Sequence, residues 1–361
     1  MERASSKDRI LVIATHKRNA GWGKFYENSF TRLGHEVKLL SHGMDEQIKA
    51  NASLDQRIKA AIFTRSKKGH EIIFKKIHER MIQEVRALKP NLLISTCGPI
   101  LPPRFVEECK SICGALFFQL LPDHPMYLYG QKFISFFLDN LPCYDCTFTF
   151  IRSSIPGLYQ LGAPRVEYLQ FAHDQYIHRP VELSPAEFDI FKNDIAYIGN
   201  WGPFKEAWAT HLAPCGLKIW GENWDHGDWG SPSKKCWQKP GREELGLGGD
   251  MAKVCAATKV IFNLIMVENE CAHSLKTFEI PACGGFMLTN RTDEQLEILE
   301  EDRHAAYYST KEELLDKLDF YLKHDETRKK ISRAGRERVK GETYDKRAEK
   351  IMKIYKEMKC Q

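Results

Sequence analysis

The sequence lacks the features of a membrane-spanning or secreted protein. Its 361 residues contain no apolar run of the ~18 residues that a helix needs to cross a bilayer. A mostly polar amino-terminal segment leads directly into the strand-like run Ile10–Ile13, without the apolar core of a signal peptide. We therefore expect a cytoplasmic protein with no stable membrane insertion.

Patterns typical of disulfide-bonded or metal-binding proteins are also sparse. The eleven cysteines are odd in number and scattered through apolar segments, which indicates reduced core residues. Cys143 and Cys146 form a C-x-x-C pair, but a β-rich segment follows where a redox helix should begin. There is no Asp-x-Asp pair for a catalytic divalent ion, and His173 and His178 lack companion ligands. We expect no metal and no bound cofactor.

The composition is that of an ordinary globular protein, with 43% hydrophobic and 28% charged residues. A chain of this length exceeds one compact core and fits two domains of roughly 150–200 residues each. The net charge of +5 is small. The densest basic run, between Arg328 and Lys340, falls on a helical pattern and indicates a solvated face. Charge therefore selects no class of partner.

Strand-like and helix-like segments alternate along the chain. In the first half we expect strands at Ile10–Ile13, Val37–Leu40, Leu92–Ser95, Ala115–Leu121 and Thr147–Phe150. In the second half we expect them at Asp194–Ile198, Leu217–Trp220, Lys259–Leu264 and Phe286–Thr289. A helical face formed by Ile77, Met81, Val85 and Leu88 ends before Pro90. This alternation predicts a parallel, doubly wound sheet in each half.

Several boundaries can be placed in the second half. Ser309 and Glu312 have the spacing of a capping box that begins a helix. The last helix is expected from Tyr344 to about Lys359, and a long surface loop between Trp224 and Asp250. The Pro-flanked segment Arg179–Pro185 marks the border of domains 1–180 and 181–342. The predicted fold class is α/β, with two Rossmann-like doubly wound domains facing across a cleft.

The segment Lys276-Thr277-Phe-Glu279 is the strongest candidate for a binding site in that cleft. Ser274 is a plausible N-cap, so that free N–H groups and the positive helix end would lie beside Lys276 and suit a diphosphate. Glu279, about one turn further on, can accept both hydroxyls of a ribose. Pro281 is expected to kink the element. The alternative is a buried helix end with a solvated lysine.

Loops after the other strands supply further donor-binding candidates. Gly199 allows a close backbone approach, and Asn200 and Lys205 follow in the same loop, where Lys205 can direct a charge toward phosphate. Gly221 follows the next strand, and Asn263 precedes the Lys276 segment. A tight turn is the structural alternative for the Gly199 loop.

A reaction in the cleft that deprotonates a hydroxyl group needs a general base, for which loops of the first domain offer candidates. His16 lies in the loop after the first strand, and Asp123 and His124 follow the strand Ala115–Leu121. We rank Asp123 first, then His16, then His124, against the alternative of solvated loop residues.

Taken together, the chain resembles a known family over about residues 140–350. The matching segments are Phe171-Ala-His-Asp174 with His178, Tyr197-Ile-Gly199, Asn263-Leu264, K-T-F-E-I-P-A-C-G-G from Lys276, Tyr308, Glu312-Glu313-Leu314 and Thr343-Tyr344-Asp-Lys-Arg347. In these segments it resembles the spore-maturation CgeB type of glycosyltransferase, with a group 1-like C-terminal domain.

The resemblance implies a GT-B fold, a nucleotide-sugar donor held mainly by the second domain, and a closing helix, 343–361, that packs back on the first domain. It implies that Glu279 binds the donor ribose. Two departures stand out. Lys276 and Lys205 occupy positions where arginine is common, and Cys271 replaces a second glutamate. Lysine keeps the charge but loses the bidentate geometry of arginine.

Three functional hypotheses follow. The first is a metal-independent glycosyltransferase that uses a nucleotide-diphosphate sugar, most simply a UDP-sugar, and a hydroxyl acceptor. The second is a nucleotide-sugar epimerase or hydrolase on the same fold, and the third is a non-catalytic coat or assembly protein. The acceptor class is open among glycan, protein, small molecule and modified DNA base.

Overall fold

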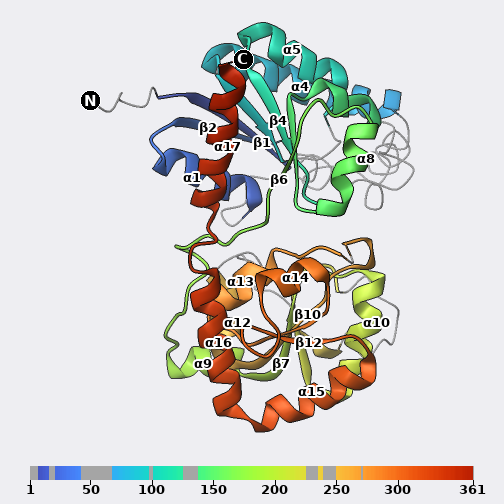
Figure 1. The fold of residues 1–361 in the computed structure, drawn as a ribbon, viewed down its shortest axis with the longest axis vertical. Coiled ribbons are helices and arrows are strands. Elements are labelled where there is room, and N and C mark those ends of the chain that lie inside the picture. Colours follow the sequence, from blue (N-terminus) through green and yellow to red (C-terminus); the bar gives the residue numbers. More distant parts are fainter. Residues whose placement is uncertain are drawn as a thin grey trace. The chain divides into compact units, whose positions relative to one another are not determined.

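The computed structural model describes residues 7–15, 21–41, 67–96, 101–124, 137–224, 235–238, 249–269 and 271–360. Contacts divide the chain into two compact units (Figure 1). The first unit combines Met1–Gln170 with Tyr344–Gln361, and the second is Phe171–Thr343. The borders predicted from the sequence, 1–180, 181–342 and 343–361, stay a prediction. No helix of the described part of the chain is both long and apolar enough to cross a membrane.

The first unit contains one parallel sheet in the order β2-β1-β3-β4-β5-β6. Its strands are β1 (Arg9–Ala14), β2 (Glu36–Ser41), β3 (Leu92–Ser95), β4 (Leu116–Leu120), β5 (Cys146–Thr149) and β6 (Val166–Tyr168). The helices are α1 (Trp22–Arg32), α4 (Lys67–Leu88), α5 (Pro103–Cys113) and α8 (Ile155–Gln160), with short 3-10 helices at Leu141–Cys143 and Arg152–Ser154.

Helices cover both faces of this sheet. Leu11 and Ile13 of β1 share a buried apolar cluster with residues of α4 and α5. Ala14 points to the other face, where a Cβ added to Gly23 of α1 would lie 2.4 Å from the Ala14 Cβ. The glycine is therefore what lets α1 approach β1 so closely.

The last helix, α17 (Tyr344–Lys359), belongs to the first unit and lies beside α1 (Figure 1). The ring of Tyr344 stacks on Phe25 with centroids 4.9 Å apart. Arg32 donates from Nε to both carboxylate oxygens of Asp345 at 3.0 Å. The Tyr355 hydroxyl donates to Asp8 Oδ1 at 3.1 Å, which fixes the end of the helix beside β1.

The second unit contains a parallel sheet in the order β12-β11-β10-β7-β8-β9. Its strands are β7 (Asn193–Ile198), β8 (Leu217–Trp220), β9 (Trp237–Gln238), β10 (Thr258–Asn263), β11 (Met287–Asn290) and β12 (Ala306–Tyr308). The helices are α9 (Pro185–Phe191), α10 (Pro203–Leu212), α12 (Gly249–Ala257), α13 (Lys276–Ala282), α14 (Asp293–Ile298), α15 (Lys311–Lys323) and α16 (Asp325–Val339), with short 3-10 helices at Ala213–Cys215 and Val267–Asn269. The strand order reverses between β7 and β10, as in a Rossmann sheet.

Every strand expected from the sequence is present, with ends within one residue of the prediction. The sequence analysis missed β6, β9 and β12, which have only three, two and three residues. Such short strands leave too few residues for a periodicity to show. β9 also lies inside the segment from Trp224 to Asp250 that was expected to be entirely loop.

The predicted capping box at Ser309 and Glu312 is displaced by one residue. The N-cap of α15 is Thr310, whose hydroxyl accepts from the Glu313 N–H at 3.2 Å. The Glu313 carboxylate in turn accepts from the Ser309 N–H at 2.7 Å. The sequence is compatible with a capping residue at Ser309 or at Thr310. The cap at Thr310 is the one observed, and with it Glu313 also pairs with Arg291.

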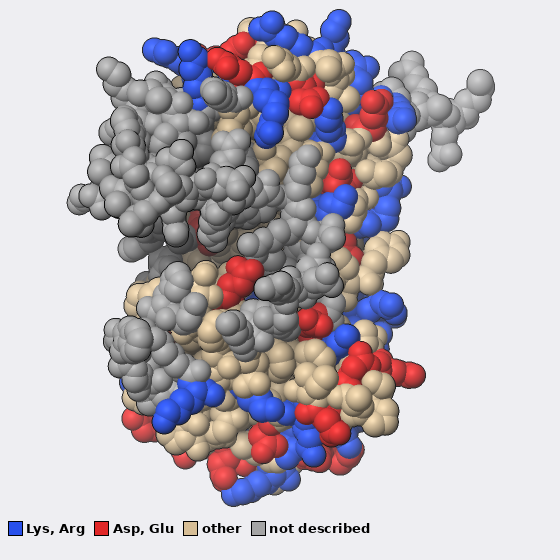
Figure 2. All heavy atoms as spheres, turned by 180° about the vertical axis from the view of Figure 1, so that it is seen from behind, with Lys and Arg blue, Asp and Glu red and all other residues tan. Residues whose placement is uncertain are grey.

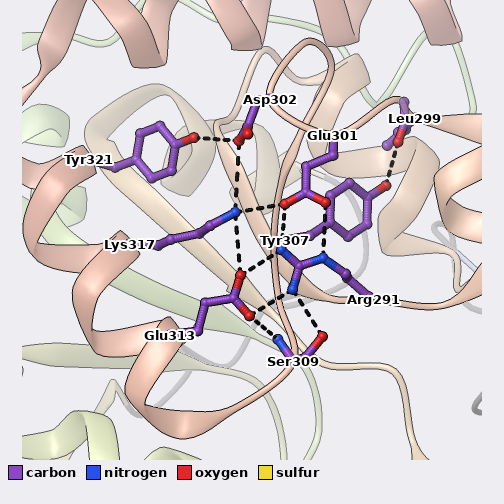
Figure 3. A network of polar contacts seen from close by, with 9 residues as sticks. All are labelled: Arg291, Leu299, Glu301, Asp302, Tyr307, Ser309, Glu313, Lys317 and Tyr321. Atoms are coloured by element: carbon purple, nitrogen blue, oxygen red, sulfur yellow. Dashed lines mark hydrogen bonds and ion pairs between the residues drawn. The ribbon is translucent and has the colours of Figure 1, made fainter.

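Charged side chains are interspersed over the face drawn in Figure 2, with basic and acidic groups next to each other. One such group forms an extended network on the second unit (Figure 3). Arg291, directly after β11, donates to Glu301 at 2.6 and 2.9 Å and to Glu313 at 2.6 and 2.7 Å. Lys317 of α15 also donates to Glu301 at 2.7 Å. The network ties the loops flanking β12 to the first turns of α15.

The Arg291 network makes the stability of the second unit depend on pH. The hydrogen bond from Arg291 lowers the pKa of Glu313 to about 2. Because the folded-state pKa lies below the ordinary value of about 4.3, the stabilisation is complete above about pH 5 and is lost as the pH falls toward 2. We expect Arg291→Gln to lower the free energy of unfolding at pH 7, because it removes charge-assisted hydrogen bonds. The decrease should be only about 1–2 kcal/mol, because the side chains are partly exposed and solvent screens their charges. This decrease in the free energy of unfolding should be smaller at pH 3, where Glu313 is partly protonated in the unfolded chain.

Denaturant unfolding of wild type and variant at both pH values measures this difference. Arg303→Gln is the matched control, since Arg303 forms a more exposed pair with Glu300. The prediction is wrong if Arg291→Gln lowers the free energy of unfolding by the same amount at pH 3 and pH 7.

Candidate functional site

The second sheet has its topological switch between β7 and β10, which pair in parallel through Ile195 with Val260 and Tyr197 with Phe262. In open α/β sheets, ligands bind outside the carboxyl ends of the strands at this point. The loop from Gly199 to Gly202 leaves β7 there, and the segment that leads to α13 leaves β10. Most of the predicted donor-binding residues therefore lie at or after the ends of the two strands that flank the switch, whereas Gly221 follows the neighbouring strand β8.

The start of α13 differs from the expectation. Its N-cap position is occupied by Leu275, not by Ser274, and no side chain caps it. The Ser274 N–H donates to Thr277 Oγ1 at 3.1 Å. The N–H groups of Thr277 and Glu279 donate to the carbonyls of Ser274 and Leu275 at 3.1 and 3.0 Å. The N–H groups of Thr277 and Glu279 are therefore taken up by carbonyls at the start of the helix.

The other end of α13 is closed by glycines. Pro281 lies inside α13 and cannot donate to the Thr277 carbonyl, and the helix ends one residue later, at Ala282. Gly284 has a φ of +81°, and the N–H groups of Gly284 and Gly285 donate to the carbonyls of Pro281 and Ile280. This is the Schellman arrangement, which satisfies carbonyls at the end of a helix and favours glycine at the left-handed position.

Lys276 and Glu279 face each other one turn apart on α13. Lys276 Nζ lies 2.7 Å from Glu279 Oε2, and the Glu279 side chain is only 6% exposed. His178, from the segment before α9, places its Nε2 3.6 Å from Glu279 Oε1. The carboxylate thus has a hydrogen-bonded ammonium group on one oxygen and an imidazole near the other.

Two hydrogen bonds orient His178. Its Nδ1 accepts from the Asp174 N–H at 3.0 Å, so the proton of the neutral ring sits on Nε2 and faces Glu279. Asp174 in turn accepts from the Tyr176 and Ile177 N–H groups through Oδ1. A buried turn therefore presents the imidazole N–H to the carboxylate.

The ionisation of this cluster follows from burial and charge. Burial by itself would raise the pKa of Glu279, but the charge of Lys276, with that of His178, outweighs it and holds the pKa below its ordinary value. Burial lowers the pKa of His178, and the nearby Glu279 charge offsets this only in part. Near neutral pH the cluster is then an ionised Glu279, a charged Lys276 and a neutral His178.

The loops after β7 and β8 are joined by backbone contacts. A Cβ added to Gly221 would lie 2.0 Å from the Gly199 carbonyl oxygen, so no other residue fits there. Asn200 Oδ1 accepts from the Glu222 N–H at 3.0 Å, and Trp224 Nε1 donates to the Gly199 carbonyl at 2.9 Å. Gly199, Asn200 and Gly221 therefore shape the edge of the switch point.

The two remaining donor candidates differ in accessibility. Lys205, in the first turn of α10, donates to the Asn200 carbonyl at 3.2 Å and stays partly exposed. Asn263, at the end of β10, is 4% exposed and donates to Thr289 Oγ1 at 3.0 Å. Asn263 therefore joins β10 to β11, whereas Lys205 presents its charge at the surface of the loop.

The candidate bases belong to the first unit. Asp123 and His124 follow the carboxyl end of β4 and are partly exposed. His16 lies outside the described residues. Their predicted catalytic role stays a prediction.

From the sequence, His178 was considered as a metal ligand and as part of the family resemblance, but its position beside Glu279 was not predicted. Its spacing from Asp174 is compatible with the observed turn, but no pattern in the sequence connects His178 to a carboxylate on α13. Among the described residues there is no group of three or more His, Cys, Asp or Glu that could hold a metal ion.

A family model described as glycosyl transferase-like matches residues 204–353, which include Lys276 and Glu279. No curated protein matches the chain in sequence.

Solved structures with a similar fold cover nearly the whole chain. A glycosyltransferase from Rickettsia africae ESF-5 has a TM-score of 0.66 at 12% identity, over 98% of this chain and 99% of that one. Sucrose-phosphate synthase (tll1590) from Thermosynechococcus elongatus has a TM-score of 0.67 at 12% identity, over 98% and 100%. Anabaena Alr3699/HepE, in complex with UDP and glucose, has a TM-score of 0.64 at 10% identity, over 96% and 99%. At these identities the likeness shows the fold, and it confirms the predicted GT-B class.

The Glu279 cluster predicts how His178 titrates. The negative charge of Glu279 favours the imidazolium, so Glu279→Gln should lower the pKa of His178 further below its ordinary value. Histidine ring resonances followed by NMR against pH measure this shift. His35, which lies beside Asp8 in the first unit, should titrate identically in both proteins. A His178 pKa that rises or stays constant in the variant would show that the two groups do not interact.

Proposed function

We propose that this protein is a glycosyltransferase that moves a sugar from a nucleotide-diphosphate sugar to a hydroxyl acceptor. The observation that carries the proposal is the buried Lys276–Glu279 pair at the switch point of the second sheet. It lies within the range matched by the glycosyl transferase-like model. The resemblance to the CgeB type, the cytoplasmic location and independence of metal belong to the same proposal.

Glu279 is suited to hold the ribose of the donor. A carboxylate can accept hydrogen bonds from two neighbouring hydroxyls, and each hydrogen bond to a charged group is worth about 1.5–3 kcal/mol. Lys276 fixes one carboxylate oxygen, and the neutral His178 N–H faces the other. The carboxylate is therefore oriented before the donor arrives, which reduces the entropy lost on binding.

Lys276 and Lys205 are proposed to bind the diphosphate. The ammonium group of Lys276 has three N–H donors and can keep its contact with Glu279 while donating to a phosphate oxygen. In the reaction, the acceptor oxygen forms a bond to the anomeric carbon, and the bond from that carbon to the diphosphate oxygen breaks. The diphosphate leaves with the electron pair, and the two lysines stabilise its charge.

The proton of the acceptor hydroxyl passes to a general base, for which Asp123 is the first choice, followed by His16 and His124. We propose a UDP-sugar as the donor, because one fold relative was solved with UDP and glucose.

The donor site can be tested by calorimetry with UDP. Lys276→Ala and Glu279→Ala should each weaken UDP binding at least tenfold, because each removes charge-assisted hydrogen bonds. Lys276→Arg should retain binding, since it keeps the charge and adds a donor fork. Lys346 and Glu349 provide a matched control pair, with the same residues at the same spacing on α17 and a separation of 2.8 Å.

The two alanine substitutions at Lys346 and Glu349 should leave UDP affinity unchanged, and circular dichroism should show that all variants are folded. Wild-type affinity in folded Lys276→Ala and Glu279→Ala proteins would refute the donor site.

Transfer can be distinguished from epimerisation or hydrolysis by incubating the protein with UDP-glucose alone. A transferase without its acceptor should release UDP only slowly, because water does not replace a bound and oriented acceptor hydroxyl. We expect a turnover at least a hundredfold below that measured once an acceptor is supplied. Fast conversion of the donor without acceptor, followed by anion-exchange chromatography, would favour the epimerase or hydrolase.

A further inference from the structure

A cavity lies at the amino ends of the strands of the second sheet, whereas the proposed donor site lies at their carboxyl ends. Its volume is about 600 Å³. Asn193 and Thr258, which line it, are the first residues of β7 and β10 and pair with each other. Cys283 and Gly284 also line it, and they follow the carboxyl end of α13, whereas Lys276 is the first residue of that helix. The cavity and the proposed donor site therefore lie at opposite ends of one short helix.

One part of the cavity lining is apolar. It is formed by two aromatic rings, Phe188 of α9 and Phe286 before β11, and by small side chains at the end of α12, including Cys255 and Ala256. Phe286 and Cys255 are buried, while Phe188 is 42% exposed although it is a large apolar side chain. A ligand with an apolar or ring-shaped body would cover this exposed surface.

The other part of the lining is strongly basic. The cationic side chains are Lys192, Lys259, Arg328, Lys329, Arg333 and Arg336, and Asp194 is the only lining carboxylate among the described residues. This excess of one sign contrasts with the interspersed charges on the face drawn in Figure 2. Four of the six cations come from α16, where the basic run noted in the sequence lies.

Half of these cations are already paired. Lys259 lies 2.8 Å from Asp194, Lys329 lies 2.8 Å from Glu326, and Arg328 pairs with Asp325. Among the residues that the structure describes, no carboxylate lies within 4 Å of the charged nitrogens of Lys192, Arg333 or Arg336. These three side chains form no salt bridge with a described residue, while Arg333 Nε donates to the Lys329 carbonyl at 3.2 Å.

We propose that this cavity binds a phosphate ester, with the phosphate held by Lys192, Arg333 and Arg336 and the apolar body against Phe188 and Phe286. The volume is in the range of small-molecule sites, about 300–1,000 Å³. Guanidinium groups match the geometry of phosphate oxygens and bind them through two hydrogen bonds at once. The phosphate ester can belong to a free small molecule or to a lipid headgroup, since both present the same oxygens.

The test uses tripolyphosphate as the probe and calorimetry in 150 mM salt, which screens weak surface attraction. The test variant is Lys192→Gln with Arg333→Gln. The matched control is Lys330→Gln with Arg338→Gln, which removes the same two charge types from exposed positions of α16 that do not line the cavity. We expect the test variant to bind tripolyphosphate at least tenfold more weakly than wild type, and the control to stay within threefold.

Two further measurements separate this site from the proposed donor site. UDP affinity should be unchanged within threefold in the Lys192→Gln/Arg333→Gln variant, and Lys276→Ala should retain the tripolyphosphate affinity of wild type. The proposal is overturned if wild type shows no saturable binding, if both double variants lose binding equally, or if Lys276→Ala alone abolishes it.

Vesicle sedimentation identifies the source of the ester. Wild type is mixed with phosphatidylcholine vesicles that contain phosphatidic acid, and with vesicles of phosphatidylcholine alone. Sedimentation that needs phosphatidic acid and is lost in the test variant supports a lipid headgroup. Tripolyphosphate binding without sedimentation supports a free phosphate ester.

Discussion

A carboxylate that is almost wholly withdrawn from water has to be neutralised by its neighbours, and the candidate site is organised around this requirement. The positive charge of Lys276, on the same helix, neutralises Glu279, and the neutral His178, on a separate segment, turns its Nε2 toward the other carboxylate oxygen. Leaving a buried charge without its partner typically costs about 3–5 kcal/mol. Removing Lys276 is therefore expected to destabilise α13 and the segment that carries His178, which packs beside the same carboxylate.

The parts of this structure that could be predicted from the sequence are those with local causes. The buried strands of both sheets appear as short apolar runs, so their positions were predicted within one residue. The spacing of Lys276 and Glu279 predicted that they share one helical face. The alternation of strands and helices predicted a parallel, doubly wound sheet in each half, whereas the order of the strands was not predicted.

The remaining parts depend on contacts between distant segments. His178 reaches Glu279 only because the turn at Asp174 is folded against α13, and no local pattern reports that contact. The predicted N-cap of α13 was wrong by one residue. Ser274 does not cap the helix with its side chain; its N–H group instead donates to Thr277 Oγ1. The capping residue of α15 was misplaced by one because two registers fit the sequence and only Arg291, from another loop, distinguishes them.

The position of α17 has a consequence for how the chain is assembled. The first unit contains residues from both sides of the second unit, whereas the second unit is one continuous stretch. During synthesis the second unit is complete before α17 emerges, and the surface of α1 around Phe25 stays uncovered until then. The first unit is therefore the last to have all of its residues synthesised, although its strand β1 is translated before every other strand of either sheet.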